Sequence, residues 1–496
     1  MRRSKDGCVT CRIRRVKCDE TRPRCRRCDT ANRECGGYPT GRMPRRRLVE
    51  LLGSSASPTS DLPLALAASP AEVAYFDLFR QVTASSTLFD SEFWQRDLLQ
   101  LTHSEPAIWH ATVAVGALQA GWQVELRGAE SDESTKDAVM HYGKALALAR
   151  NIDCPEKAAA LSLILMATTN MLGRWSESQL HILASLRMPA HQDTAVRMDF
   201  QAMSYSDSES PYPYDKTSAV TDLDRILLDT AQEITTIREA GSRMFAVMRA
   251  YFLLDESMVT GELAQGPFLT RYEAFLRNLC AWERCMERFN EGKDESQLAE
   301  TLSLRLYHAL LRLFVRTGSL GPETRFDDCL GYFEYIIRLA TALQEASPLS
   351  GKLSLEPGLI IPLYTIVHRC RHSSLRHHAL GILQGLNNIE GNWRSAPAAR
   401  VAARVVAIEE DGLAPSTVLS IDHAQPWVPW RAWSRVDFEL PSSASPADVL
   451  VPEGNRVRDV CPMADLEARR MDLRMLMCST NGVDPYGSVR EEVVYF

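Results

Sequence analysis

Six cysteines near the start of the chain are spaced as metal ligands would be. They follow the pattern C-x2-C-x6-C, and six residues later the same pattern is repeated. Each cysteine of the first half recurs 17 positions further on, so the segment duplicates a unit of three thiolates. Thiolates in this number and spacing predict zinc coordination. The cysteines are Cys8, Cys11, Cys18, Cys25, Cys28 and Cys35.

Three thiolates cannot close a structural zinc site, because zinc in such sites takes four ligands in a tetrahedron. Six thiolates can serve two zinc ions if two equivalent cysteines, one from each repeat, bridge both ions. The alternative is a disulfide framework, which requires an oxidising compartment. The N-terminal sequence MRRSKDGC contains no apolar export segment, so zinc is favoured over disulfides.

The two repeats differ in charge. The first repeat carries four cations between its second and third cysteines, and the second repeat has no such excess. Arginine and lysine are the groups that contact phosphates and guanine edges. We therefore expect the helix of the first repeat to face DNA, the alternative being a solvated basic helix. The expected DNA-binding residues are Arg12, Arg14, Arg15 and Lys17.

This segment resembles the fungal Zn2Cys6 binuclear cluster domain of transcription factors. The run CRIRRVKCD, residues 11–19, matches that family's C-R-x-R/K-K/R-x-K-C-D pattern. The resemblance implies two Zn²⁺ ions bridged by Cys8 and Cys25. It further implies that Arg15 reads bases, usually of a CGG-like triplet in the major groove, with Arg14 also at the DNA and Lys17 near its backbone. Lysine is commoner than arginine at the base-reading position.

The charge of the chain is asymmetric. Its 496 residues carry a net charge of −7, but residues 1–47 hold 16 Lys+Arg and 5 Asp+Glu. That segment therefore has a charge of +11, which leaves −18 for the remainder. A basic head on an acidic body indicates nucleic acid at one end and protein partners at the other. No apolar stretch is long enough to predict a membrane partner.

Four parts are expected along the chain. They are a Zn2Cys6 DNA-binding domain at 1–38, a flexible basic and Ser/Pro-rich linker at 39–69, an α-helical regulatory domain at 70–412, and a C-terminal segment at 413–496. The linker has too few apolar heptads for a coiled coil. The C-terminal segment, with Trp427, Trp430 and Trp433, is expected to be partly extended and docked on the helical domain.

The predicted fold class is a small zinc-stabilised binuclear cluster domain followed by a large, mainly α-helical regulatory domain. The sequence Ser69-Pro70-Ala71-Glu72 has the form of a capping box at a helix start. Apolar stripes at helical spacing follow, and they predict helices packed in layers or in an α-solenoid-like row. The stripes lie at 93–101, 107–120, 158–172, 244–254, 302–315, 332–343, 359–367 and 401–408.

This body also resembles the fungus-specific regulatory region that follows zinc clusters in filamentous fungi. The resemblance is carried by AYFDLFR at 74–80, AIWHATVAVGAL at 107–118, the run at 360–383 and the segment at 391–410. It implies a regulatory role for the body.

A second group of metal-binding residue types lies at His368, Cys370, His372, His377 and His378. His368 and His372 are four residues apart and would share a face of one helix. No third ligand is placed by the spacing, so a packing role is favoured over a second metal site. No nucleotide-binding or hydrolase motif is present, and the chain is therefore not expected to be an enzyme.

These observations favour a nuclear, sequence-specific DNA-binding regulator of RNA polymerase II genes. The basic clusters at 2–5 and 45–47 could serve nuclear import or supply phosphate contacts. The family resemblance suggests control of a biosynthetic gene cluster. The helical domain is the expected site of homodimer or co-regulator contacts. The alternative is a protein-interaction adaptor whose zinc cluster does not read sequence; an enzyme with a DNA-tethering head has only the size of the body in its favour.

Overall fold

The structure is a computed structural model of the chain, which divides into two units, residues 1–64 and 65–496. In the first unit, the described secondary structure is the short helix α2 (Arg26–Asp29). The expected linker at 39–69 lies almost wholly outside the described residues. The described residues are 18–19, 21, 24–31, 68–85, 92–128, 132–205, 233–259, 265–292, 299–318, 321–346, 351–413, 419–435, 438–466, 468–479 and 486–496.

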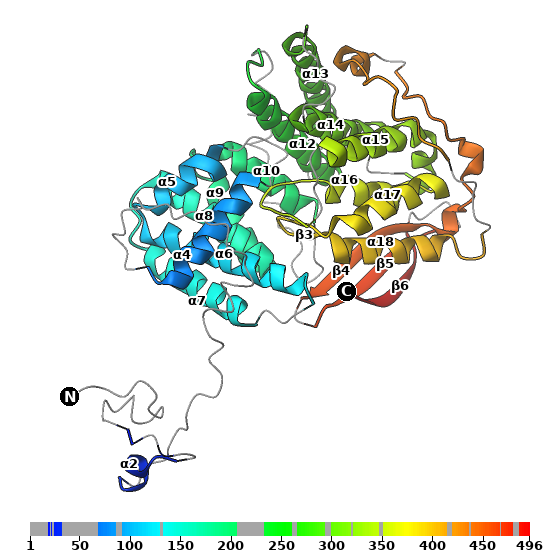
Figure 1. Ribbon diagram of the computed structural model, residues 1–496. Helices are drawn as coiled ribbons and strands as arrows, with labels where there is room; N and C mark the ends of the chain where they lie inside the picture. The colour runs from blue at the N-terminus through cyan, green and yellow to red at the C-terminus, as the bar shows by residue number, and fades with distance from the viewer. Residues whose placement is uncertain are drawn as a thin grey trace. The chain divides into compact units, whose positions relative to one another are not determined.

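The first helices of the second unit surround helix α6, as the blue and cyan ribbons of Figure 1 show. Apart from the partly exposed His110, helix α6 is buried from Ala107 to Trp122, because most of its residues on every side are small or apolar. It contacts α4, α7 and α8. These helices are α4 (Pro70–Ser85), α5 (Leu98–Thr102), α6 (Pro106–Glu125), α7 (Asp132–Ala149), α8 (Pro155–Met171), α9 (Trp175–Leu186) and α10 (Gln192–Met203), with the π-helical turn η1 (Phe93–Asp97) before α5.

Helices α4 and α6 cross at Gly116. A Cβ atom at this position would clash with the backbone carbonyl of Tyr75 on α4. Glycine is therefore the residue that permits this close approach of the two backbones.

A second group of helices shares the main hydrophobic core with α10. Helices α14 and α15 lie at its centre, and nearly all of their apolar residues are buried. The group comprises α12 (Ile237–Val259), α13 (Gln265–Phe289), α14 (Ala299–Thr317), the 3-10 helix η2 (Glu323–Cys329), α15 (Leu330–Ala346), α16 (Ile360–Arg369), α17 (Ser373–Leu386) and α18 (Ser395–Glu409). Among the described residues, no helix is long and apolar enough to cross a bilayer.

The helices are arranged in layers and do not form a solenoid. In a solenoid each repeat contacts only its neighbours along the chain. Here α6 contacts α8 as well as α7, α15 contacts α17, and α14 contacts α16. The mainly helical character of the body is confirmed.

The body also contains two small sheets. Strands β1 (Leu353–Ser354), β2 (Ile389–Glu390) and β3 (Trp393–Arg394) form the first, with β1–β2 parallel and β2–β3 antiparallel. Strands β4 (Val457–Asp465), β5 (Arg470–Cys478) and β6 (Tyr486–Tyr495) form an antiparallel meander in the order β4-β5-β6.

One face of the meander packs on α18. Alternate residues of β5, including Leu473 and Met475, are buried against Val401 and Val405 of the helix. This alternation follows from the two-residue period of a strand. The C-terminal end of the chain is thus part of the helical unit's packing, and the red ribbon in Figure 1 lies beside α18.

Part of the tryptophan-rich segment is helical. Residues Trp430–Ser434 form the 3-10 helix η3. A 3-10 helix has three residues per turn, so Trp430 and Trp433 lie on one face, and both are buried. Their rings contact the buried His308 of α14 at centroid distances of 5.4 and 4.8 Å.

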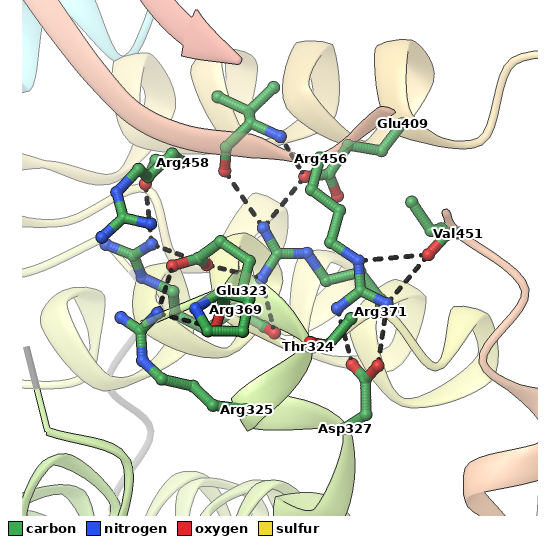
Figure 2. A network of polar contacts seen from close by, with 12 residues as sticks. Glu323, Thr324, Arg325, Asp327, Arg369, Arg371, Glu409, Val451, Arg456 and Arg458 are labelled. Atoms are coloured by element: carbon green, nitrogen blue, oxygen red, sulfur yellow. Dashed lines mark hydrogen bonds and ion pairs between the residues drawn. The ribbon is translucent and has the colours of Figure 1, made fainter. Parts of the chain in front are cut away.

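A buried network of charges joins η2, α16, α18 and the start of the meander (Figure 2). The carboxylate of Glu323 accepts from Arg369 at 2.9 Å and from Arg371 at 3.0 Å. Arg371 also donates to Glu409, which in turn accepts the backbone N–H of Val457 at 2.7 Å. The network therefore connects the strand β4 to the helical core.

Arginine side chains keep the buried carboxylates of this network ionised. Burial alone would raise the pKa of Glu323, but Arg369, Arg371 and Arg325 outweigh it and lower that pKa to about 2. Beside it, Arg456 holds Asp327 through two bonds of 2.8 Å. Buried charges are tolerated when they are paired in this way.

Several sequence predictions are confirmed in the body. Ser69 N donates to Glu72 Oε2 at 2.5 Å and Glu72 N donates to Ser69 Oγ at 3.3 Å, which is the expected capping box. The eight apolar stripes fall in helical segments, the first of them in η1 and α5; the stripes at 158–172 and 359–367 each extend by one residue to a helix cap.

The prediction that His368 and His372 share one helix is wrong. His368 lies in the last turn of α16, and the backbone becomes extended at Cys370. His372 is the N-cap of α17, where its Nδ1 accepts the N–H of Leu375. The helix break places the two imidazoles on separate elements, and within the described residues they do not form a metal-binding group.

Candidate metal centre and nucleic-acid interface

Cys25 is positioned by the start of helix α2. It is the N-cap residue, with extended backbone angles of φ −78° and ψ 139°, and its Sγ accepts the N–H of Cys28 at 3.3 Å. The N–H of Cys28 also points at the Cys25 carbonyl, 3.1 Å away. A thiolate is a better acceptor here than a thiol, because helix N-termini favour negative charge. The turn thus brings the C-x2-C pair onto one side of the backbone.

Cys18 approaches Cys25 from the preceding loop. Their ligand atoms, together with a carboxylate oxygen of Asp19, all lie within 4.8 Å of one another. Zinc that binds sulfurs at about 2.3 Å in a tetrahedron holds them ~4 Å apart, so thiols already this near can share one ion after small adjustments of their side chains. Cys18, Cys25 and Cys28 are buried and none of them is in a disulfide. These residues fit zinc.

Asp19 fixes the loop that carries Cys18 to the helix that carries Cys28. Its Oδ2 accepts the N–H of Arg26 at 3.0 Å and the hydroxyl of Thr21 at 2.8 Å. Desolvation acts to raise the pKa of Asp19. The hydrogen bonds from Thr21 and from the backbone together outweigh this effect and lower the pKa, so the carboxyl stays ionised. In the sequence, Asp19 is part of the CRIRRVKCD motif. Its position directly after Cys18 was the available signal.

The remaining predicted site residues lie outside the described residues. They are the metal ligands Cys8, Cys11 and Cys35 and the DNA-binding residues Arg12, Arg14, Arg15 and Lys17. The described part of the second repeat presents Arg26 and Arg27 on exposed positions of α2. The ligand set and the DNA contacts therefore stay predictions.

A second group with metal-binding residue types lies in the body. His110 Nδ1 is 3.0 Å from His141 Nδ1, and His141 Nε2 is 3.7 Å from Glu72. Burial, then Lys144 and His110, lower the pKa of His141 to about 4, so both rings are neutral at neutral pH. Glu72 is already engaged in capping α4, and the nearby ammonium of Lys144 opposes a cation. We assign this group a structural role.

Comparison with known proteins agrees with the cysteine geometry. The family model described as "Fungal Zn(2)-Cys(6) binuclear cluster domain" matches residues 6–45. The chain is 60% identical over 47 residues to the aspercryptin biosynthesis cluster-specific transcription regulator atnN of Emericella nidulans. It is 39% identical over 111 residues to the transcriptional regulatory protein moc3 of Schizosaccharomyces pombe. No solved structure matches the chain significantly.

These similarities are partial. The matched segments cover 9% and 21% of this chain, and 8% and 20% of the two relatives. A longer match, 29% identical over 216 residues, is to the transcriptional regulatory protein C15D4.02 of S. pombe, and covers 42% of this chain and 37% of that protein. The chain therefore carries, at residues 6–45, a fungal Zn(2)-Cys(6) binuclear cluster domain for two zinc ions, joined to a mainly helical body.

Proposed function

We propose that the protein is a sequence-specific DNA-binding transcription regulator. The observation that supports this most is the match of residues 6–45 to the binuclear cluster domain, combined with the approach of the Cys18 and Cys25 sulfurs to within 4.8 Å of each other. Zinc folds the segment, and the first repeat presents its cations to DNA. In this proposal Arg15 reads a CGG-like triplet, while Arg12, Arg14 and Lys17 contact DNA around it.

The proposal extends to the place and targets of action. A regulator of RNA polymerase II genes acts in the nucleus, and several relatives are named as transcription regulators. One relative is named as specific to a biosynthesis cluster, which supports control of a biosynthetic gene cluster here. The helical body has no sequence motif of an enzyme, and we propose that it serves co-regulator or homodimer contacts.

The experiment compares two arginine variants that lose the same charge. Arg15→Ala removes the proposed base reader, whereas Arg27→Ala removes an exposed cation of the second repeat. Binding of the full zinc-loaded chain is measured for a duplex with a CGG triplet and for the same duplex with that triplet permuted. We expect Arg15→Ala to lower the ratio of the two affinities by about 5- to 150-fold, as the loss of one bidentate base contact would.

Arg27→Ala is expected to weaken both duplexes alike and to keep the ratio. If Arg15→Ala also keeps the ratio, Arg15 does not read bases. If the wild-type chain binds both duplexes equally and with little dependence on salt, the adaptor alternative is correct.

A further inference from the structure

The helical body contains a partly open cavity of about 490 Å³, a size typical of small-molecule sites. It lies between α10, α12, α16, the start of α18 and the strand β4. The cavity is far larger than a single water, which occupies about 30 Å³. All of its lining residues belong to the second unit, residues 65–496.

Aromatic rings form one continuous wall of the cavity. The ring centroids of Trp175 and Tyr205 are 5.0 Å apart, and those of Tyr205 and Trp393 are 5.3 Å apart. The wall continues to Tyr364, whose ring lies 5.2 Å from that of Trp393. Rings at these spacings offer flat apolar faces on which another planar ring can pack. The wall therefore favours an aromatic ligand.

Arg394 adds to this wall a positive charge that pairs with no carboxylate lining the cavity. Three carboxylates line the cavity, and two of them, Glu323 and Asp459, pair with Arg369 (Figure 2 shows the Arg369–Glu323 pair). The third is Asp255. Arg394 pairs with none of the three, and its one hydrogen bond among the described residues is to the carbonyl of Met171 at 2.8 Å.

The surroundings of Arg394 make this charge costly. Burial is the main cause that lowers the pKa of Arg394; Glu125 and Tyr205 act to raise this pKa, and Arg469 acts to lower it. Arg394 is also the N-cap residue of α18, whose first turn contains no acidic residue. A helix N-terminus carries partial positive charge, so it adds to the field of the guanidinium. An anion bound here would offset the charge of the guanidinium and the partial positive charge of the helix N-terminus.

Two buried polar atoms in the cavity provide further contact points for a ligand. Within the described residues, His368 Nε2 and Asn392 Oδ1 have no hydrogen-bond partner, although these residues are only 7% and 6% exposed. Both residues line the cavity. Buried polar groups normally have a hydrogen-bond partner. Where a buried group lacks one, a bound ligand or a water can explain it.

We propose that this cavity binds a small planar aromatic carboxylate as an effector of the body. The carboxylate pairs with the guanidinium of Arg394, and the ring packs on Trp393 and Tyr364. Hydroxyl or amide groups on the ligand bond to Asn392 and His368. A charge-assisted, two-point bond of this kind is the strongest recognition that arginine makes with a carboxylate.

The test uses three acids of increasing size, benzoate, 1-naphthoate and anthracene-9-carboxylate, with 1-naphthamide as the uncharged analogue. Binding to the full-length chain is measured by calorimetry and by quenching of tryptophan fluorescence. We expect saturable binding of at least one acid at one site per chain, and 1-naphthoate at least tenfold tighter than 1-naphthamide. Saturable binding of none of the acids at millimolar concentration would overturn the proposal.

Variants locate the bound acid. Arg394→Met should weaken carboxylate binding at least tenfold and leave 1-naphthamide unchanged. Arg394→Lys keeps the charge and should retain part of the affinity. Arg400→Met is the matched control, because Arg400 is an exposed cation on the same helix and lies outside the cavity. Equal effects of Arg394→Met and Arg400→Met on 1-naphthoate would overturn the proposal.

A folding defect in Arg394→Met is checked by thermal unfolding. If that variant does not fold, Arg394→Lys and the naphthoate-to-naphthamide ratio of the wild type decide the matter. A ratio near one shows that the cavity does not select an anion, and the proposal fails.

Discussion

Arg371 donates from Nη2 to the carboxylate of Glu409 at 3.0 Å, and both side chains are completely excluded from solvent. Arg371 belongs to the turn between α16 and α17, whereas Glu409 ends α18. The pair therefore connects two helices at the point where the C-terminal meander begins. Burying these charges is tolerated because each one has several partners.

Breaking this pair should destabilise the body strongly. Arg371→Met leaves Glu409 and Glu323 with one cation fewer in a dry environment, and we expect the free energy of unfolding to fall by about 3–5 kcal/mol. The matched control is Arg404→Met, which breaks the more exposed pair with Glu492 and should cost less than about 1 kcal/mol. Urea unfolding of the two variants measures the difference, and equal losses would show that burial does not determine the role of Arg371.

The contact between the meander and α18 should also contribute several kcal/mol. Leu473 is 1% exposed and packs on this helix. Leu473→Ala should lower the free energy of unfolding by about 2–5 kcal/mol, through lost apolar burial and the cavity that remains. Val489→Ala on β6, at a position that is 48% exposed, is the control and should cost far less. Similar losses at both positions would contradict the packing described.

The stability of the body should depend on pH through its buried histidines. Burial is the main cause that lowers the pKa of His141 to about 4 and of His368 to about 3. In the unfolded chain histidine titrates near 6.5, so below that pH the unfolded state binds protons that the folded state does not. Their contribution to stability is therefore lost as the pH falls from about 6.5 toward 4.

A variant separates this effect from opposing ones. Burial raises the pKa of Glu390 to about 7, which stabilises the fold as the pH falls over part of the same range. His141→Gln removes only the histidine contribution. We expect the loss of unfolding free energy between pH 7 and pH 5 to be smaller in His141→Gln than in the wild type. An identical pH dependence would show that His141 titrates normally in the folded chain.

Much of the body could be predicted from sequence because its signals are local. The capping box at Ser69 and the apolar stripes depend on residues a few positions apart, and the structure confirms both. The break between His368 and His372 was missed because it results from packing of two helices and not from a proline or glycine. The sequence predicts that the segment with Trp430 and Trp433 docks on the helical domain, but it does not identify His308 as their partner, since the residues that meet are more than 100 positions apart.

The zinc cluster can be predicted from the sequence, whereas the cavity in the helical body cannot. The six cysteines are visible because metal ligands in this domain recur at short, fixed spacing. Trp175, Tyr364 and Arg394 carry no such signal, since three separate segments bring them to one cavity. Chemistry that depends on tertiary contacts of this kind cannot be predicted from the local pattern.

The zinc content of the chain tests the bridged cluster. Two zinc ions per chain are expected by metal analysis, and Cys25→Ser should lower the content below that of a single intact site because the residue is predicted to bridge both ions. Cys154→Ser, in the helical body, is the control and should keep two ions. One zinc per wild-type chain would contradict the bridged arrangement.

The most direct measurement of the central claim is the affinity of the full zinc-loaded chain for a CGG-containing duplex relative to the duplex with that triplet permuted, over a range of salt. The account predicts at least about tenfold tighter binding to the CGG duplex. It also predicts that both affinities fall steeply with salt, as several phosphate contacts require. Equal affinity for the two duplexes, or binding that salt does not weaken, would contradict the account.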